Sequence, residues 1–206
     1  MKNTLFIAIS TLFICSCGLD EKKLPILGER DFVNGDTIYA TIPAFQFVNQ
    51  DSAIINNGTY KGKIYIVDFF FTHCPTICPK VKKNMLRIYD RYKSNDKVLQ
   101  LSHTIDPTRD TIGRLKEYAS KLNIDSKKWS LVTGDKFKIY EIANRYFAVA
   151  KEDPDAPGGF DHSGNIILVD SKGRVRAFAD GTDADAVNKF MLDIDLLLKE
   201  ENSNQK

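Results

Sequence analysis

Two cysteines lie four residues apart, at Cys74 and Cys78, directly after the apolar run 64–71. The other two cysteines of the chain, Cys15 and Cys17, lie near its amino terminus in a leader-like segment. A domain that places both of its thiols in one five-residue window uses them together. The spacing suits a redox pair, and it suits two ligands of a soft metal ion equally well.

Pro79 follows Cys78 and fits the first turn of a helix, which places Cys78 near a helix N-terminus. Unpaired N–H groups and the helix dipole favour an anion there, so the pKa of a thiol is lowered and the thiolate is populated. Residues four apart on a helical turn have Cα atoms about 6 Å apart, within the range that a disulfide tolerates. Both chemistries therefore stay open.

Two thiolates supply only part of a coordination shell, and the chain has three histidines. His73 adjoins Cys74, but adjacent side chains of an extended segment point to opposite sides. His103 is expected at a sheet margin, without an assigned role. His162 lies at a strand entrance after a Gly-rich loop, where functional residues concentrate, although a lone histidine is more often structural. Sulfur with imidazole suits copper(I), copper(II) also uses such a set, and zinc requires a fourth ligand.

Asp68 interrupts the apolar strand six residues before Cys74, where thioredoxin carries its buried acid. A buried carboxyl group there has a raised pKa and passes protons to a thiol during disulfide exchange. The alternative is that Asp68 faces solvent or a hydrogen-bonding partner. Lys80, Lys82 and Lys83 follow the cysteines and are expected on a solvated helix face, the alternative being that they steer an acidic partner.

The leader combines Lys2 with an apolar run over residues 5–15, which is shorter than the about 20 residues that span a bilayer. Its exit, Ile14-Cys15-Ser16-Cys17, resembles a bacterial lipobox, and a cut there leaves the lipid on Cys17. The alternative is an ordinary cleaved signal. We expect a lipoprotein signal over residues 1–16, a flexible tether over 17–38, a folded domain over 39–200 and a polar tail over 201–206. The domain then faces the periplasm or the cell exterior, where disulfides are permitted.

Composition is typical of one soluble domain, with 43% apolar and 27% charged residues. The formal charge of +2 is too small and too evenly spread to indicate a nucleic-acid partner.

Strand-like and helix-like patterns alternate along the chain, which predicts an α/β sandwich of three layers around a central mixed sheet. A hairpin of residues 44–49 and 53–55 precedes this unit, and Asp110 is the expected N-cap of its second helix. The cysteines fall at the junction of the first central strand and its helix, which is the thioredoxin arrangement. The expected strands cover residues 64–71, 98–102, 129–132, 165–169 and 175–178.

Three segments resemble the SCO/SenC family of copper-binding, thioredoxin-fold proteins that serve cytochrome c oxidase assembly. They are residues 71–79 around the cysteines, residues 105–111 (Ile-Asp-Pro-Thr-Arg-Asp-Thr) and residues 161–163 (Asp-His-Ser). The resemblance implies that Cys74, Cys78 and His162 bind copper, whereas His73 does not. One departure is Thr76, where the family often has an acidic residue.

The resemblance implies a membrane-tethered chaperone that delivers one copper ion to the CuA-bearing subunit of cytochrome c oxidase, with other copper chaperones as further partners. The alternative is a thiol–disulfide oxidoreductase that reduces the CuA cysteines through Cys74 and Cys78. His162 favours copper, because an oxidoreductase has no need of it, and Asp68 favours exchange. A peroxidase of the peroxiredoxin type is disfavoured, since no PxxxTxxC motif surrounds either cysteine.

Overall fold

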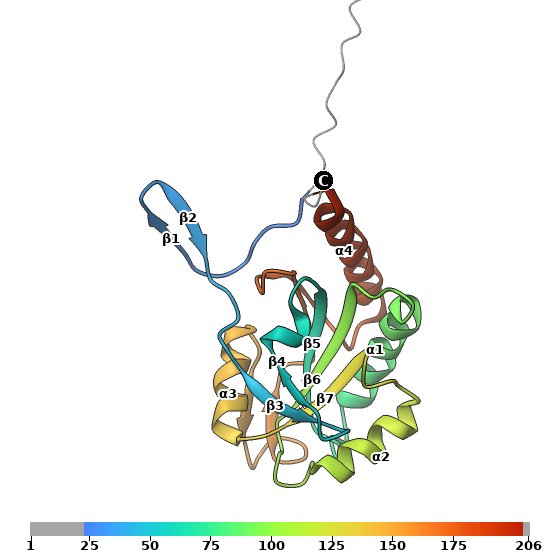
Figure 1. Ribbon diagram of the computed structural model, residues 1–206. Coiled ribbons are helices and arrows are strands. Elements are labelled where there is room, and N and C mark those ends of the chain that lie inside the picture. Colours follow the sequence, from blue (N-terminus) through green and yellow to red (C-terminus); the bar gives the residue numbers. More distant parts are fainter. Residues whose placement is uncertain (1–22, 204–206) are drawn as a thin grey trace, which may run out of the picture.

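The central strand is β5 (Ile64–Phe70), and all seven of its residues are buried. A continuous apolar run of this kind requires cover on both faces of the sheet. β5 pairs in parallel with β6 (Val98–Thr104), which pairs in parallel with β7 (Trp129–Thr133). The computed structural model describes residues 23–203 and places these three strands at the centre of the molecule (Figure 1).

Seven strands form the main sheet, in the order β11-β10-β5-β6-β7-β3-β4. The four strands outside the parallel core are antiparallel to their neighbours: β3 (Gln46–Asn49), β4 (Ile54–Asn56), β10 (Asn165–Val169) and β11 (Val175–Asp180). β3 and β4 form the expected N-terminal hairpin, and a 3-10 turn, η1 (Asn57–Tyr60), leads from β4 towards β5. The predicted mixed sheet with its N-terminal β-hairpin is confirmed.

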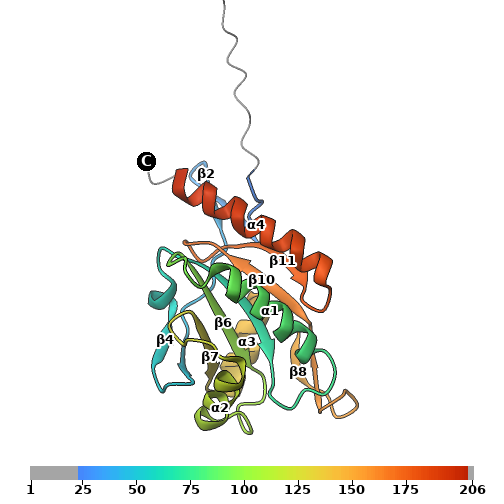
Figure 2. The same ribbon diagram turned by 90° about the vertical axis from the view of Figure 1, so that its right-hand side faces the viewer.

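Helices cover both faces of this sheet. α1 (Cys78–Tyr92), α2 (Ile112–Leu122) and α4 (Ala184–Ser203) lie on one face, and α3 (Lys136–Arg145) lies on the other (Figure 2). Phe70 of β5 joins two of them, because Tyr118 of α2 stacks on its ring and Lys82 of α1 lies over it. The chain therefore has the predicted three layers.

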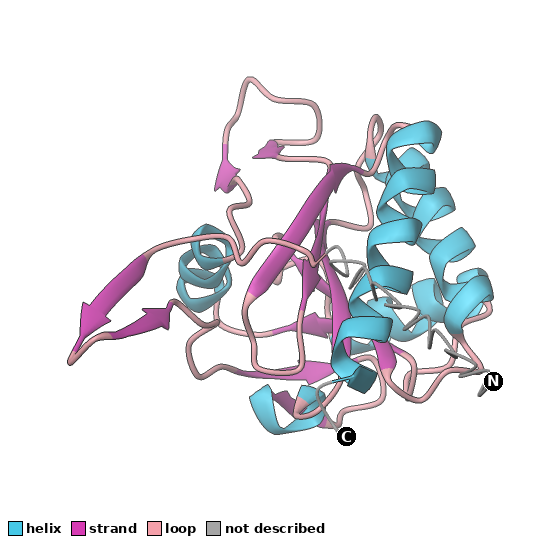
Figure 3. Cartoon of the chain, turned by 90° about the horizontal axis from the view of Figure 1, so that it is seen from above, coloured by secondary structure: helices cyan, strands magenta, loops and turns pink. Residues whose placement is uncertain are grey.

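A second hairpin, β1 (Arg30–Val33) with β2 (Asp36–Tyr39), projects from the body and is seen from above in Figure 3. It lies where the sequence predicts a flexible tether without regular structure, so the structure differs from that expectation. Asn34 and Gly35 both have positive φ, as a two-residue hairpin turn requires, and Asn-Gly is its strongest sequence signal. The segment before the hairpin is also anchored, because Arg176 donates hydrogen bonds to the carbonyl groups of Leu24 and Pro25.

The predicted signal peptide over residues 1–16 and the predicted lipid on Cys17 lie outside the described residues. At the other end α4 runs on to Ser203, three residues into the predicted tail, and Ser171 donates a hydrogen bond to Glu201 of this helix. None of the helices within residues 23–203 has the length and apolar character needed to cross a membrane.

His103 lies inside the sheet in β6, not at its margin, and its side chain is completely buried. Its ring stacks on Phe69 with centroids 5.1 Å apart and meets the edges of Phe45 and Phe47. Within the described part of the chain, neither ring nitrogen has a hydrogen-bond partner. Desolvation lowers the pKa of His103 from 6.5 to about 3, so the imidazole is neutral in the folded protein.

We predict that His103→Phe makes the protein more resistant to acid. Between pH 6.5 and 3 the unfolded chain binds a proton at His103 that the folded chain does not, so the free energy of unfolding falls as the pH falls. The loss is about 1.4 kcal/mol per pH unit within that window. Urea titrations of both proteins at several pH values from 7.5 to 4 measure it, and equal pH slopes would contradict the prediction.

Candidate metal centre

Cys74 and Cys78 lie beyond the carboxyl end of β5, where open α/β sheets bind their ligands. Cys78 is the first residue of α1, and its N-cap residue Ile77 makes no side-chain capping bond. The sulfur of Cys74 caps the helix in place of such a side chain, because it accepts a hydrogen bond from the backbone N–H of Cys78 at 3.4 Å. A sulfur atom thus satisfies one of the unpaired donors at the start of the helix.

This arrangement lowers the pKa of Cys74 far below the usual thiol range. The main cause is a hydrogen bond from the Cys78 thiol, and the N–H groups of Thr76 and Cys78 add to it against the effect of burial. The pKa of Cys78 is raised, first by the same hydrogen bond and then by desolvation. The sequence predicts a lowered pKa for Cys78, whereas in the structure the hydrogen bond between the two thiols lowers the pKa of Cys74 and raises that of Cys78.

His162 is the last residue of β9 (Phe160–His162), which pairs with β8 (Ala150–Glu152) in a small hairpin beside the start of α1 (Figure 2). Its Nε2 atom lies 3.2 Å from the Cys78 sulfur and 3.9 Å from the Cys74 sulfur. The three donor atoms all lie within 4.8 Å of one another. The structure therefore brings together the three residues expected to form one site, from three separate elements.

The other histidine beside the cysteines is not part of this group. His73 is exposed, and its Nδ1 atom lies 3.1 Å from the hydroxyl group of Thr72. Thr76 lies with its hydroxyl group 3.8 Å from the Cys74 sulfur. A neutral hydroxyl group thus lies next to the site.

Asp110 holds the segment that leads to Cys74. This buried carboxylate accepts hydrogen bonds from the backbone N–H of Thr72 at 3.0 Å, from the Thr72 hydroxyl and from the Thr104 hydroxyl. It thereby joins the carboxyl ends of β5 and β6. The sequence predicts Asp110 as the N-cap of α2, but Thr111 takes that position and accepts from the N–H of Arg114.

Asp68 is completely buried and does not face solvent. Its carboxylate pairs with the Lys82 ammonium at 2.7 Å and accepts a hydrogen bond from Ser102. Within residues 23–203, no hydrogen bond joins Asp68 to either cysteine, so its role as a proton acceptor stays a prediction. The prediction that Lys82 lies on a solvated face is wrong, since only 2% of this residue is exposed; Lys80 and Lys83 are exposed as expected.

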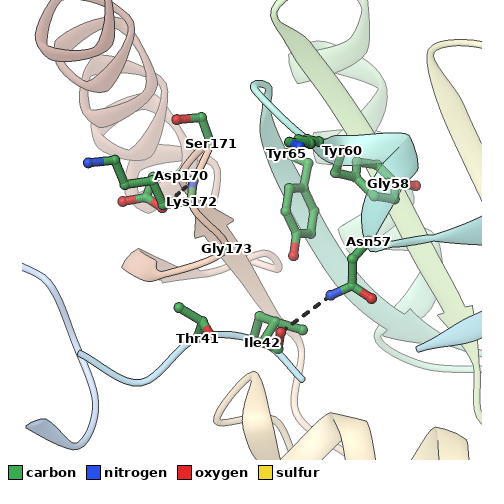
Figure 4. A pocket seen from close by; sticks show the side chains of 11 residues that line it. Thr41, Ile42, Asn57, Gly58, Tyr60, Tyr65, Asp170, Ser171, Lys172 and Gly173 are labelled. Atoms are coloured by element: carbon green, nitrogen blue, oxygen red, sulfur yellow. Dashed lines mark hydrogen bonds between the residues drawn. The ribbon is translucent and has the colours of Figure 1, made fainter. Parts of the chain in front are cut away.

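A pocket of about 370 Å³ lies at the opposite end of the sheet, near the start of β5. Figure 4 shows Tyr65 between the turn 170–173 and Asn57, whose amide donates a hydrogen bond to the carbonyl of Ile42. None of its lining residues is a cysteine or a histidine. The two cysteines and His162 lie at the other end of the sheet, outside this pocket.

Known proteins share this architecture and parts of this sequence. The family model described as SCO1/SenC matches residues 35–192. A SCO1/SenC family lipoprotein from Bacillus anthracis has a crystal structure that is similar with a TM-score of 0.70, at 27% identity, over 77% of this chain and 95% of that one.

Two further solved structures are similar at 27% identity. BsSco, a member of the Sco family of cytochrome c oxidase assembly proteins in which a disulfide switch was identified, has a TM-score of 0.67 over 76% of this chain and 92% of that one. ScoI of Bradyrhizobium japonicum with copper bound has a TM-score of 0.59 over 74% and 98%. Because the family model covers most of the chain, from β2 to α4, this protein belongs to the SCO1/SenC family.

Proposed function

We propose that this protein binds one copper ion through Cys74, Cys78 and His162 and delivers it to the CuA site of cytochrome c oxidase during assembly of the enzyme. The observation that carries the proposal is the convergence of the His162 Nε2 atom on both sulfurs, at 3.2 and 3.9 Å. Metal bonds to sulfur and imidazole are about 2.0–2.3 Å long, so donors of one ion lie at most about 4.4 Å apart. Both nitrogen–sulfur distances meet this limit.

The protonation of the pair suits uptake of a soft cation. A metal requires deprotonated thiols, and the hydrogen bonds to Cys74 already keep its sulfur in the thiolate form. Loading then releases the proton of Cys78. Two thiolates and one neutral imidazole match the preference of copper(I), and copper(II) accepts the same set.

The position of the site suits transfer. Pro75 and Thr76 next to the first cysteine are exposed, and His162 is half-buried, so a recipient protein reaches the ion from this side. Three protein ligands leave a coordination position for a donor atom of the recipient. An ion held in this way moves by ligand exchange and does not have to be released into solution.

The same geometry supports the thiol–disulfide alternative. A thiolate at Cys74 with a protonated Cys78 beside it is the arrangement of an attacking and a resolving thiol. Disulfide exchange does not require His162, however. The Nε2 atom of this histidine lies close to both sulfurs, and its ring packs edge-on against Phe71. This histidine is why copper binding is the first proposal.

We further propose that a lipid on Cys17 anchors the protein to a membrane, with the domain in the periplasm or at the cell exterior. Only five residues separate Cys17 from Lys23, where the described structure begins. The lipobox-like exit of the leader supports this anchor, and it keeps the domain beside the membrane surface.

The copper proposal predicts that His162→Ala weakens copper binding at least about 100-fold, because one of three ligands is lost. The chain from residue 18 onward is suited to the measurement, since Cys74 and Cys78 are then its only thiols. Copper(I) and copper(II) stoichiometry and affinity are measured by competition with chelators. His73→Ala is the matched control and is expected to bind one copper ion as the wild type does. Unchanged binding by His162→Ala, with reduction of the CuA cysteines retained, would overturn the proposal in favour of exchange.

The loop before His162 holds this ligand in place through Gly158. Gly158 has φ +83°, and a Cβ atom there would lie 2.7 Å from the ring of Phe71 and 3.3 Å from Pro75. Glycine therefore lets the loop pack directly against the segment that carries Cys74. Gly159 next to it has φ +86°, but no heavy atom of the described chain lies within 4 Å of its added Cβ.

These two glycines give a matched pair of variants. Gly158→Ala and Gly159→Ala carry similar backbone strain, of order 1 kcal/mol, because both residues have positive φ. Only Gly158→Ala also displaces the His162 loop, so we expect about tenfold weaker copper binding for it than for Gly159→Ala. Chelator competition measures the ratio, and equal affinities of the two variants would show that packing at Gly158 does not place the ligand.

A further inference from the structure

The hairpin of β1 and β2 carries apolar side chains that stay exposed in the described part of the chain. All four residues of β1 are exposed, and so are three of the four residues of β2. Phe32 is 74% exposed, Ile38 is 52% exposed and Val33 is 46% exposed. An isolated hairpin of two strands is marginally stable in water unless another surface packs against it. The hairpin therefore has the character of a contact element.

Strand pairing sorts the side chains of this hairpin onto two unlike faces. Directly opposite residues share a face, and the faces alternate along each strand. The pairs on the two faces are Arg30–Tyr39 with Phe32–Thr37, and Asp31–Ile38 with Val33–Asp36. The first face thus carries two aromatic rings and a guanidinium group but no acid, whereas both aspartates lie on the second face. Aromatic rings and arginine are the side chains that settle at the boundary between lipid and water.

The hairpin lies at the end of the molecule where the described chain begins. Arg176 fixes this beginning, because it donates hydrogen bonds to the carbonyl groups of Leu24 and Pro25. Only five residues lie between Lys23 and Cys17, and a chain of this length spans at most about 20 Å. Figure 1 shows the fixed segment and the hairpin at the same upper end of the molecule. A lipid on Cys17 therefore brings the hairpin close to the bilayer.

Exposed lysines border the same end, and the metal centre lies at the other. Lys61 precedes β5 and Lys172 lies in the turn after β10, and both are exposed at the rim of the pocket in Figure 4. The buried acid beside them, Asp170, is paired with Arg176 at 3.2 Å. Lysines close to a membrane are attracted to anionic headgroups. The two cysteines follow the opposite end of β5, so a membrane on the lysine side leaves the metal centre facing away from it.

We propose that the β1–β2 hairpin lies on the lipid surface, with Arg30, Phe32 and Tyr39 turned into the interface and the acidic face turned to water. This inference rests on the lipid anchor proposed above and adds a second contact to it. A single attachment point fixes the distance of a domain from a membrane but not its orientation. Two points restrict rotation of the domain, so the metal centre is held pointing away from the bilayer, towards a recipient protein.

The test uses tryptophan fluorescence of the protein expressed with its leader, purified in detergent and reconstituted into vesicles without copper. Trp129 is the only tryptophan of the chain and is completely buried, so a tryptophan introduced at the surface reports on its own position. The vesicles contain phosphatidylcholine and phosphatidylglycerol in equal parts, with or without bromine on the acyl chains near the headgroups. Bromine quenches an indole that lies close to it. Phe32→Trp is expected to lose about half of its added fluorescence in the brominated vesicles, because an interfacial side chain reaches the depth of the bromine.

Phe137→Trp is the matched control. Phe137 is 77% exposed, so the two phenylalanines are equally accessible to water. It lies at the start of α3, just after the carboxyl end of β7, at the edge of the sheet that carries the cysteines. A membrane at the hairpin end does not reach this position, and its fluorescence is expected to be the same in both kinds of vesicle.

Val33→Trp tests which face meets the lipid, since Val33 lies on the acidic face and nearer the turn. Its quenching is expected to be weaker than that of Phe32→Trp, and equal or stronger quenching would overturn the assigned face. Absence of quenching in Phe32→Trp, in a protein whose mass shows the lipid on Cys17, would overturn the proposal and leave the face to a protein partner. A mass without the lipid would overturn the anchor, and this inference with it. The two failures are thus read separately, and neither depends on copper binding.

Discussion

The hydrogen bond from the Cys78 backbone N–H to the Cys74 sulfur is the interaction on which the site depends. It exists because β5 ends four residues before Cys74 and α1 begins at Cys78, so the intervening turn brings the first sulfur over the open end of the helix. A thiolate there satisfies a donor that no capping side chain satisfies. The fold of this segment and the charge of its sulfur therefore support each other.

Separate contacts keep this turn in place from different sides. Asp110 ties Thr72 to the end of β6, Gly158 lets the His162 loop pack on Phe71, and the Lys82–Asp68 pair lies beneath the start of α1. Each contact joins elements far apart in the sequence through a buried polar or tightly packed residue. A metal or redox centre made of side chains needs such support, because small displacements change the distances between its donor atoms.

Local patterns were enough to predict much of this architecture. The apolar run of β5, the proline after Cys78 and the period of α1 predict the strand-to-helix junction, and family motifs identify His162. What could not be predicted depends on partners distant in the chain. From the sequence, Lys82 is expected on the protein surface. Its burial depends on the pairing of β5 with β6, which sets Asp68 opposite Ser102 and creates a polar site for the ammonium group. The acidified thiol likewise depends on which cysteine donates to the other. The β1–β2 hairpin, in contrast, could be predicted from the sequence, because the turn signal Asn34-Gly35 is local.

Copper binding and disulfide exchange both require a stabilised thiolate at Cys74. The acidity of this thiol therefore does not distinguish the two functions, and neither does the thioredoxin-like fold. His162 does, because an imidazole 3.2 Å from the Cys78 sulfur adds a donor atom that exchange does not use. The position of this imidazole is therefore the structural feature that favours the proposed copper site over disulfide exchange.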